Sequence, residues 1–245
     1  MNEGYTATAD FEQISVALKS FWKPFNELLN EMDSFVPRPL SDFDEERKRY
    51  SEHIGALNPH MSEDEISADA ERLIESSKNA GWQFYGRFSD RIMTMYVTVT
   101  LLSQALCEAE INAILAIGLH EKGLANQFAK IERADIRKKW LEHPKLFCPT
   151  YELLKNSELY ITLNHLIENR NAWMHHKIEL SVGEEKILDG SLRERDTYQE
   201  KMRWLKRYFS LPYDLADHAH EYTHQAIAAM MFFTRNPIPI ADAHK

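Results

Sequence analysis

The chain has 245 residues, of which 44% are hydrophobic and 11% aromatic, and this content excludes an intrinsically disordered protein. Only 8 glycines and 9 prolines are present, so a turn-rich sandwich or barrel is not expected, while frequent Leu, Ala, Glu, Met and Lys favour helices. The formal net charge of −9 excludes a global attraction to nucleic acid, so an RNA partner would need a local basic surface.

The N-terminus, the apolar segments and the cysteines favour a soluble, cytoplasmic protein. Residues 1–10 have neither the basic start nor the apolar core of a signal peptide. The most apolar region, residues 93–119, is interrupted by glutamate and amide side chains, so we expect no membrane span there. Cys107 and Cys148 are too few for a disulfide scaffold and fit a reducing compartment.

In the first third of the chain, prolines and serines mark the predicted helix ends. Residues 11–32 predict an amphipathic helix in which Pro24 introduces a kink or a break. Ser41 opens an acidic stretch and suits an N-cap, because its hydroxyl can accept a free backbone N–H. Residues 62–65 form a second acidic start, favourable at the positive end of a helix dipole, and predict a helix that ends near residue 79.

The middle of the chain predicts its longest helix. Between residues 87 and 120, apolar side chains recur with a period of about 3.6, and Gly123 fits the exit of this helix. Residues 124–141 predict a shorter and more basic helix. Ser157 is a candidate cap for the helix that follows and runs to Arg170.

After residue 176 the pattern changes. Residues 177–182 alternate in polarity, which fits either a short hairpin or a loop. Residues 192–209 and 213–235 then predict two helices divided by Pro212.

The fold class expected from these elements is all-α. The sequence shows no internal repeat and no low-complexity linker. We therefore expect a helical domain over residues 81–245 and a helical extension over residues 1–80, together forming one compact unit.

One short motif places polar side chains where the apolar stripe of a helix should continue. The stripe passes Leu163 and Ile167 and then meets Arg170 and Asn171, with His175 close behind. Burying a guanidinium or an amide without a partner costs on the order of several kcal/mol. Such residues are therefore expected to serve either a structural pair or chemistry.

Arg170 and His175 do not share a face of an ideal helix. They lie five residues apart, roughly 140° in azimuth, whereas Asn171 and His175 lie four apart and do share a face. Arg170 and His175 could act on one substrate if the helix bends, if the long arginine reaches round, or if a second subunit completes the site across a two-fold axis.

The segment Arg170-Asn171-Ala172-Trp173-Met174-His175 resembles the arginine–four-to-six–histidine motif of the HEPN superfamily, including the asparagine favoured after the arginine. In that family a long earlier helix with polar residues packs against the motif helix, and residues 101–112 are similar to that element. The resemblance covers about residues 93–235. It implies an up-and-down helical bundle, here with additional N-terminal helices to which it assigns no role.

The resemblance implies metal-independent RNA cleavage by attack of the ribose 2′-hydroxyl, with 2′,3′-cyclic phosphate products and no cofactor. His175 would act as general base or acid, since an ordinary histidine pKa of about 6.5 suits proton transfer at neutral pH. Arg170 would stabilise charge on the phosphorane, and Asn171 would orient His175 or the phosphate. His176 is a supporting residue beside them.

The resemblance also implies partners. Family members commonly form homodimers in which two motifs line one cleft, and they include toxins and defence nucleases. We expect RNA as the substrate and an antitoxin or another protein as a partner. The alternative is a non-catalytic module that binds RNA, a nucleotide or a protein, because the fold often serves as a binding scaffold.

Two glutamates on the predicted long helix are further supporting candidates. Glu110 shares a stripe with Cys107, and its carboxylate could pair with Arg170 and hold it in place. Equally, Glu108, Glu110 and Asn112 could form a solvated helix edge. The sequence leaves both interpretations open.

Two basic clusters are candidate RNA-binding surfaces. The first contains Lys138 and Lys139, and the second contains Arg203, Lys206 and Arg207, with aromatic residues interleaved. Acidic residues are mixed into both clusters. A solvated helix face with salt bridges is therefore the competing and simpler interpretation.

A rival signal is the segment His220-Glu221-Tyr222-Thr223-His224, which matches the H-E-x-x-H pattern of zinc proteases on a predicted helix. No third ligand is evident, because only about twenty residues follow and Ile227 stands where one class of these enzymes needs glycine. A zinc hydrolase is the third hypothesis, after the nuclease and the non-catalytic module, and incidental metal binding by His218, His220 and His224 is the favoured interpretation of these histidines.

Overall fold

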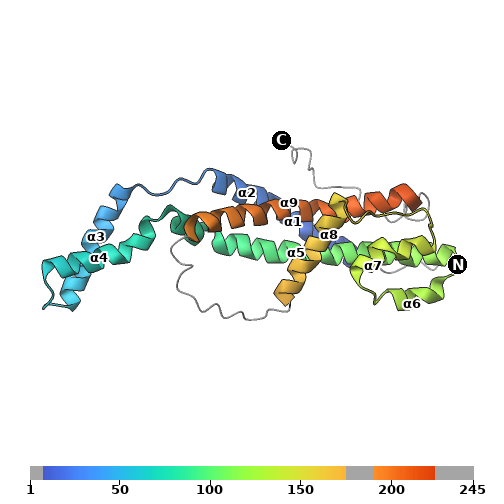
Figure 1. The fold of residues 1–245 in the computed structure, drawn as a ribbon, viewed down its shortest axis with the longest axis horizontal. Coiled ribbons are helices and arrows are strands. Elements are labelled where there is room, and N and C mark those ends of the chain that lie inside the picture. Colours follow the sequence, from blue (N-terminus) through green and yellow to red (C-terminus); the bar gives the residue numbers. More distant parts are fainter. Residues whose placement is uncertain (1–7, 175–189, 224–245) are drawn as a thin grey trace. The chain divides into compact units, whose positions relative to one another are not determined.

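The computed structural model describes residues 8–174 and 190–223. Within these ranges the protein is all-helical and has no strand, as the composition predicts (Figure 1). The α-helices are α1 Thr8–Ser20, α2 Trp22–Asp33, α3 Phe43–Leu57, α4 Glu63–Lys78, α5 Ala80–Glu121, α6 Phe128–Ile131, α7 Ile136–Leu141, α8 Glu158–Met174 and α9 Gly190–Thr223. Short 3-10 helices are Leu40–Asp42, Ala125–Gln127 and His143–Leu146. The segment 177–182, predicted as a hairpin or loop, lies outside the described residues.

The chain divides into two compact units, each assembled from separate segments. Of the described residues, the first unit contains 8–26, 95–174 and 202–223, and the second contains 27–94 and 190–201. Helices α2, α5 and α9 contribute residues to both units. The boundaries in this part of the chain follow residues 26 and 94, and not residue 80. α1 therefore belongs to the same unit as α8, and α3 and α4 belong to the other unit.

Aromatic packing forms much of the core of the first unit. Trp22 and Phe25 lie against Phe209 of α9, with ring centroids 5.2 Å and 5.3 Å apart. Near the C-terminal end of α5, a Cβ on Gly118 would lie 2.6 Å from the ring of Phe147. Only glycine therefore allows this approach between the helix and the loop.

In the second unit, α3 and α4 pack against each other as a helical hairpin. The Ser62 hydroxyl accepts from the Glu65 backbone N–H at 3.3 Å, and the Glu65 carboxylate accepts from the Ser62 N–H at 2.9 Å. This reciprocal capping box confirms the predicted acidic start of the helix. Across the hairpin, Arg47 donates to Glu71 at 2.7 Å, and Lys78 pairs with the same carboxylate.

Two predicted features near the N-terminus are wrong in detail. The break within residues 11–32 falls at Phe21, between α1 and α2, while Pro24 lies in the first turn of α2. A proline is tolerated there because that backbone N–H would have no helical partner. Ser41 lies inside a 3-10 turn, and α3 starts after Asp42 without a side-chain cap.

The chain after α5 also differs from its prediction. Gly123 has a φ of 71°, the left-handed conformation that ends many helices, so the predicted exit is confirmed. Residues 124–141, however, form two short helices, α6 and α7, and not one basic helix. The carboxylate of Asp135 accepts from the backbone N–H of Arg137 at 2.8 Å and thereby starts α7 anew.

Pro212 does not divide the last helices. α9 passes through it as one helix. A proline removes the hydrogen bond to the carbonyl four residues earlier, which belongs to Tyr208. Tyr208, Leu211 and Tyr213 are all buried, so the packing on both sides of Pro212 holds the helix together across this gap.

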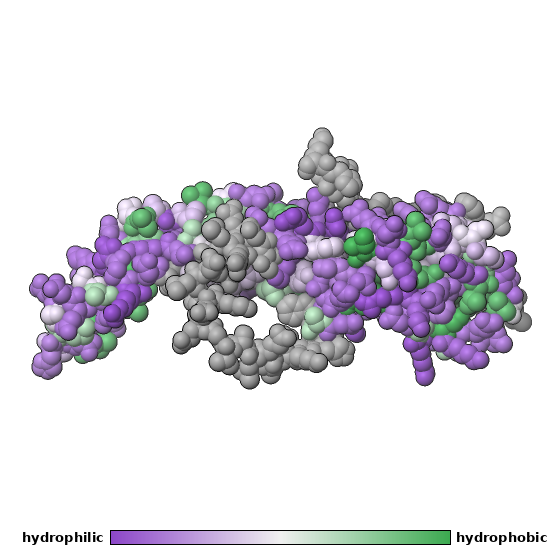
Figure 2. Space-filling model, viewed as in Figure 1, coloured by the Kyte–Doolittle hydropathy of each residue, from purple (hydrophilic) through white to green (hydrophobic). Residues whose placement is uncertain are grey.

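α5 is long and apolar enough to cross a membrane by length and composition, a test that core helices of soluble proteins also pass. Here Leu106, Ile111 and Leu115 of α5 are fully buried within the protein. Figure 2 shows that hydrophilic residues cover most of the visible face of the described chain. These residues of α5 therefore belong to the core of the first unit.

Candidate functional site

α8 carries the first part of the Arg170 motif and is anchored at its start. The backbone N–H of Tyr160 donates to the Ser157 hydroxyl at 3.3 Å, which confirms Ser157 as the cap. The apolar side of α8 is buried through Leu163, Leu166 and Ile167. This burial fixes which side of the helix is left for polar groups.

Arg170 and Asn171 lie near the C-terminal end of α8, half-buried and in contact. The Arg170 guanidinium donates to the Asn171 side-chain oxygen at 3.1 Å. A guanidinium carries five N–H donors, so one amide contact does not exhaust its capacity. His175 and His176 lie outside the described residues, and the meeting of Arg170 with His175 stays a prediction.

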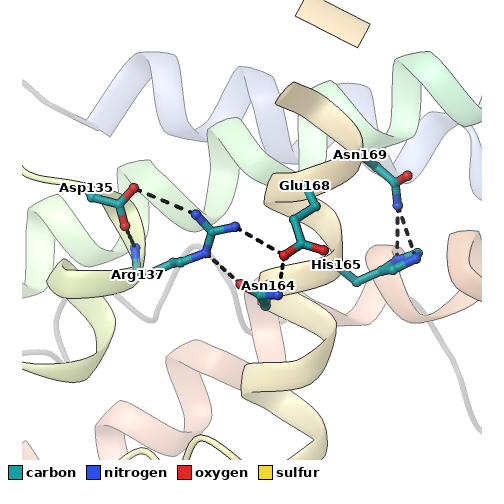
Figure 3. Close-up of polar contacts among 6 residues, drawn as sticks. All are labelled: Asp135, Arg137, Asn164, His165, Glu168 and Asn169. Carbon is teal, nitrogen blue, oxygen red and sulfur yellow. Dashed lines mark hydrogen bonds and ion pairs between the residues drawn. The ribbon is translucent and has the colours of Figure 1, made fainter. Parts of the chain in front are cut away.

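Four further polar residues of α8 were not singled out from the sequence. Asn164 donates to the carboxylate of Glu168 at 2.7 Å, and the Asn169 side-chain nitrogen lies 3.0 Å from His165 Nδ1 (Figure 3). Each pair is four residues apart, the spacing that places side chains one above the other on a helix. Two polar pairs with this spacing in one short segment could have been recognised in the sequence.

His165 joins α8 to α9. Its Nδ1 lies 2.6 Å from the Tyr208 hydroxyl, which also accepts from Asn169 at 2.7 Å. The imidazole stacks on Trp204, with ring centroids 3.6 Å apart and an interplanar angle of 21°. Burial, with the neighbouring Tyr96, raises the pKa of Tyr208 well above its ordinary value, so its hydroxyl is a neutral donor.

Arg137 ties α7 to α8. Its Nε donates to Asn164 at 2.6 Å, and its guanidinium lies 3.8 Å from Glu168 and 3.9 Å from Asp135 (Figure 3). A guanidinium engaged with two carboxylates and an amide is a structural clamp. We therefore do not count Arg137 among the candidate phosphate contacts.

Glu110 does not pair with Arg170. It is 4% exposed, its Oε1 makes no hydrogen bond within the described chain, and no ion pair joins it to Arg170 there. Burial, reinforced by Asp217, raises the pKa of Glu110 to about 8. The predicted pairing is thus not formed, and a solvated edge is also wrong for this residue, because its position on α5 faces the core.

Lys139 is not a surface residue, which corrects its assignment to RNA binding. Its side chain is fully buried, and Nζ donates to Glu108 at 3.0 Å. It lies on the side of α7 that also buries Ile136 and Trp140. An ammonium withdrawn from solvent cannot reach a phosphate, so Lys139 and Glu108 form a structural pair, while the neighbouring Lys138 is exposed.

The second basic cluster lies on the surface of α9. Arg203 and Arg207 are exposed and Lys206 is half-buried. Arg207 lies over the Trp204 ring at 5.0 Å from its centroid and 3.2 Å from the Glu158 carboxylate. Exposed cations beside a half-buried tryptophan fit phosphate and base contacts, and the ion pair fits a solvated face. Both interpretations stay predictions.

The zinc-protease pattern gains no support from geometry. His218 Nε2 donates to the carbonyl oxygen of Glu152 at 3.0 Å, so that nitrogen is not a free metal ligand. Within residues 8–174 and 190–223, no three His, Cys, Asp or Glu side chains form a group that could hold a metal. His224, the second histidine of the pattern, lies outside those ranges.

The negative charge of the protein is concentrated in one segment. Residues 27–94 contain 15 acidic and 8 basic residues, a net charge of −7, which leaves −2 of the total −9 for the rest of the chain. Arg170, Arg203 and Arg207 all lie outside this segment. The overall acidity therefore does not describe the part of the chain that carries the candidate site.

Comparisons with known protein families, with curated proteins and with solved structures find no match to this chain. Its function is therefore inferred from its own residues and from the resemblance of the Arg170 motif.

Proposed function

We propose that this protein is a metal-independent endoribonuclease of the HEPN type, acting in the cytoplasm as a toxin or defence enzyme. The observation that carries the proposal is the contact between Arg170 and Asn171 near the end of α8, a helix that ends at Met174, the residue before His175. The all-helical fold and the concentration of acidity in residues 27–94 are consistent with it.

Three residues would supply the chemistry. His175 takes the proton of the ribose 2′-hydroxyl, or gives one to the leaving 5′-oxygen. The 2′-oxygen bonds to phosphorus and the bond to the 5′-oxygen breaks, which leaves a 2′,3′-cyclic phosphate and a 5′-hydroxyl. Arg170 stabilises the charge that develops on the phosphorane, and Asn171 orients the phosphate or His175.

A homodimer is part of the proposal. On a regular helix, Arg170 and His175 are separated by roughly 140° in azimuth, so one motif presents only part of the site to a given phosphate. A second copy of the chain related by a two-fold axis would complete it. An antitoxin or another protein partner would then act by covering the paired motifs.

The first prediction tests catalysis directly. Wild-type protein is incubated with mixed RNA in EDTA, together with Arg170→Ala and His175→Ala. We expect the wild type to cleave RNA to cyclic phosphate products and both variants to lose about 100-fold or more in rate, because each removes a transition-state contact or the proton carrier. Matched controls are Arg72→Ala, whose side chain is 82% exposed on α4, and His53→Ala on α3.

Three results would contradict the proposal in different ways. RNA left equally intact by wild type and variants would exclude catalysis. Cleavage that depends on added metal would exclude the mechanism. Saturable RNA binding without turnover would favour the non-catalytic binding module.

A further inference from the structure

The hydrogen bonds around His165 link it to Asn169 and Tyr208. The side-chain nitrogen of Asn169 can only donate, so Tyr208 accepts from it at 2.7 Å, and the Tyr208 hydroxyl lies 2.6 Å from His165 Nδ1. The Asn169 nitrogen lies 3.0 Å from the same Nδ1 and 3.3 Å from Nε2, so it contacts both nitrogens of the ring.

The same network connects three helices of the first unit. Tyr208 of α9 is fully buried, and Tyr96 of α5 also hydrogen bonds to its hydroxyl. The face of the His165 ring is held against Trp204 at a centroid distance of 3.6 Å. A hydrogen-bond network that spans several helices rigidifies the elements that carry it.

The network ends immediately before the motif. Asn169, bound to both His165 and Tyr208, is followed directly by Arg170 and Asn171, which contact each other. Fixing Asn169 restricts the helical turn from which Arg170 projects. Catalytic groups must be held within about 0.5 Å of their working geometry, and a misplacement of about 1 Å can cost about 100-fold in rate.

We propose that His165 is a positioning residue of the nuclease site, which acts through Asn169 and Tyr208 to fix the part of α8 that presents Arg170 and Asn171 to the phosphodiester. This inference rests on the proposed function. His165 itself does not touch the substrate. Its Nδ1 contacts Tyr208 and Asn169, and its ring stacks on Trp204.

Three variants separate the hydrogen bonds from the packing. His165→Phe keeps an aromatic ring against Trp204 but removes the ring nitrogens, Tyr208→Phe removes only the hydroxyl, and His165→Gln keeps an amide that can hydrogen bond to Tyr208. Matched controls are Tyr160→Phe, which removes a hydroxyl elsewhere on α8, and His53→Phe on α3.

For RNA cleavage, we expect kcat to fall about tenfold or more in His165→Phe and Tyr208→Phe, with KM changed less than about twofold, because substrate contacts stay while their alignment is lost. His165→Gln should recover part of the lost kcat. A kcat equal to that of wild type in both phenylalanine variants would overturn the proposal.

A second measurement does not depend on activity. Amide hydrogen exchange at residues 168–171 should accelerate about tenfold in His165→Phe without a change elsewhere on α8. If the wild type cleaves no RNA but this acceleration is found, the proposed function fails while the role of His165 in holding α8 stands. Unchanged exchange in His165→Phe would overturn that role itself.

Discussion

The carboxyl of Glu110 makes the stability of the first unit depend on pH. Burial, then the charge of Asp217, raises its pKa from 4.5 to about 8. Between these values the folded protein keeps the proton while the unfolded chain releases it. The free energy of unfolding therefore falls as pH rises through this window, by up to about 1.4 kcal/mol per pH unit, and the loss levels off above the folded pKa.

Glu110→Gln should remove this dependence, because an amide of the same shape does not ionise. We expect the free energy of unfolding of the variant, measured relative to wild type by urea denaturation, to increase steadily from pH 5 to pH 8. Glu121→Gln, at the exposed end of α5, is the matched control and should run parallel to wild type. A constant difference between Glu110→Gln and wild type across this range would contradict the prediction.

At the residue scale, the sequence indicates which side chains are suited to chemistry but not which of them are exposed to solvent. The polar groups Arg170 and Asn171 stood out because they interrupt an apolar stripe. Lys138 and Lys139, by contrast, look alike in the sequence, yet one is exposed and the other is fully buried. Successive residues on a helix point about 100° apart, and only the packing of α7 decides which of them faces the core.

Among the elements, α7 is held to α5 by a salt bridge with unequal partners. Lys139 is fully buried, whereas the Glu108 side chain is 43% exposed. Removing Glu108 leaves a buried ammonium without its counter-charge, while removing Lys139 leaves a carboxylate that water can reach. The two single substitutions should therefore differ in cost.

We expect Glu108→Ala to lower the free energy of unfolding by about 3 kcal/mol, and Lys139→Met, which keeps the length of the side chain, to change it by less than about 1 kcal/mol. Lys138→Met is the exposed control. Denaturant titrations at neutral pH measure all three. A larger loss in Lys139→Met than in Glu108→Ala would show that the ammonium stabilises α7 beyond its pairing.

Periodicity and caps predicted the elements that are locally determined. The long α5, its exit at Gly123, the acidic start at residues 62–65 and the cap Ser157 are confirmed, because each depends on residues within a few positions of one another. The sequence predicts a helix end at Pro212, because a proline inside a helix costs about 3 kcal/mol. Burial of the flanking residues of α9 outweighs that cost, and burial is not a local property.

Over the whole molecule, the separation of charge bears on RNA binding. Residues 27–94 carry a net charge of −7, and Arg203 lies in the nearly neutral remainder. If RNA contacts this remainder, we expect Arg203→Ala to weaken binding about equally for different sequences and to reduce the salt dependence by about one unit in slope.

Fluorescence anisotropy of labelled RNA at increasing salt concentration measures that slope. Arg72→Ala, an exposed arginine within the acidic segment, should leave both affinity and slope unchanged. Equal effects of the two substitutions would mean that RNA does not discriminate between the two parts of the chain, and that the α9 cluster is a solvated helix face.

The sequence by itself determined the all-helical class, most helix positions and the motif around Arg170, because helical periodicity, caps and residue chemistry are encoded within short segments. Tertiary structure alone decided that Lys139 and Glu110 are buried, that α9 continues through Pro212, and that His165 meets Tyr208. These outcomes depend on contacts between residues far apart in the sequence, such as His165 and Tyr208, which are separated by 43 positions. Such contacts arise when helices pack, and no local pattern specifies which faces will meet.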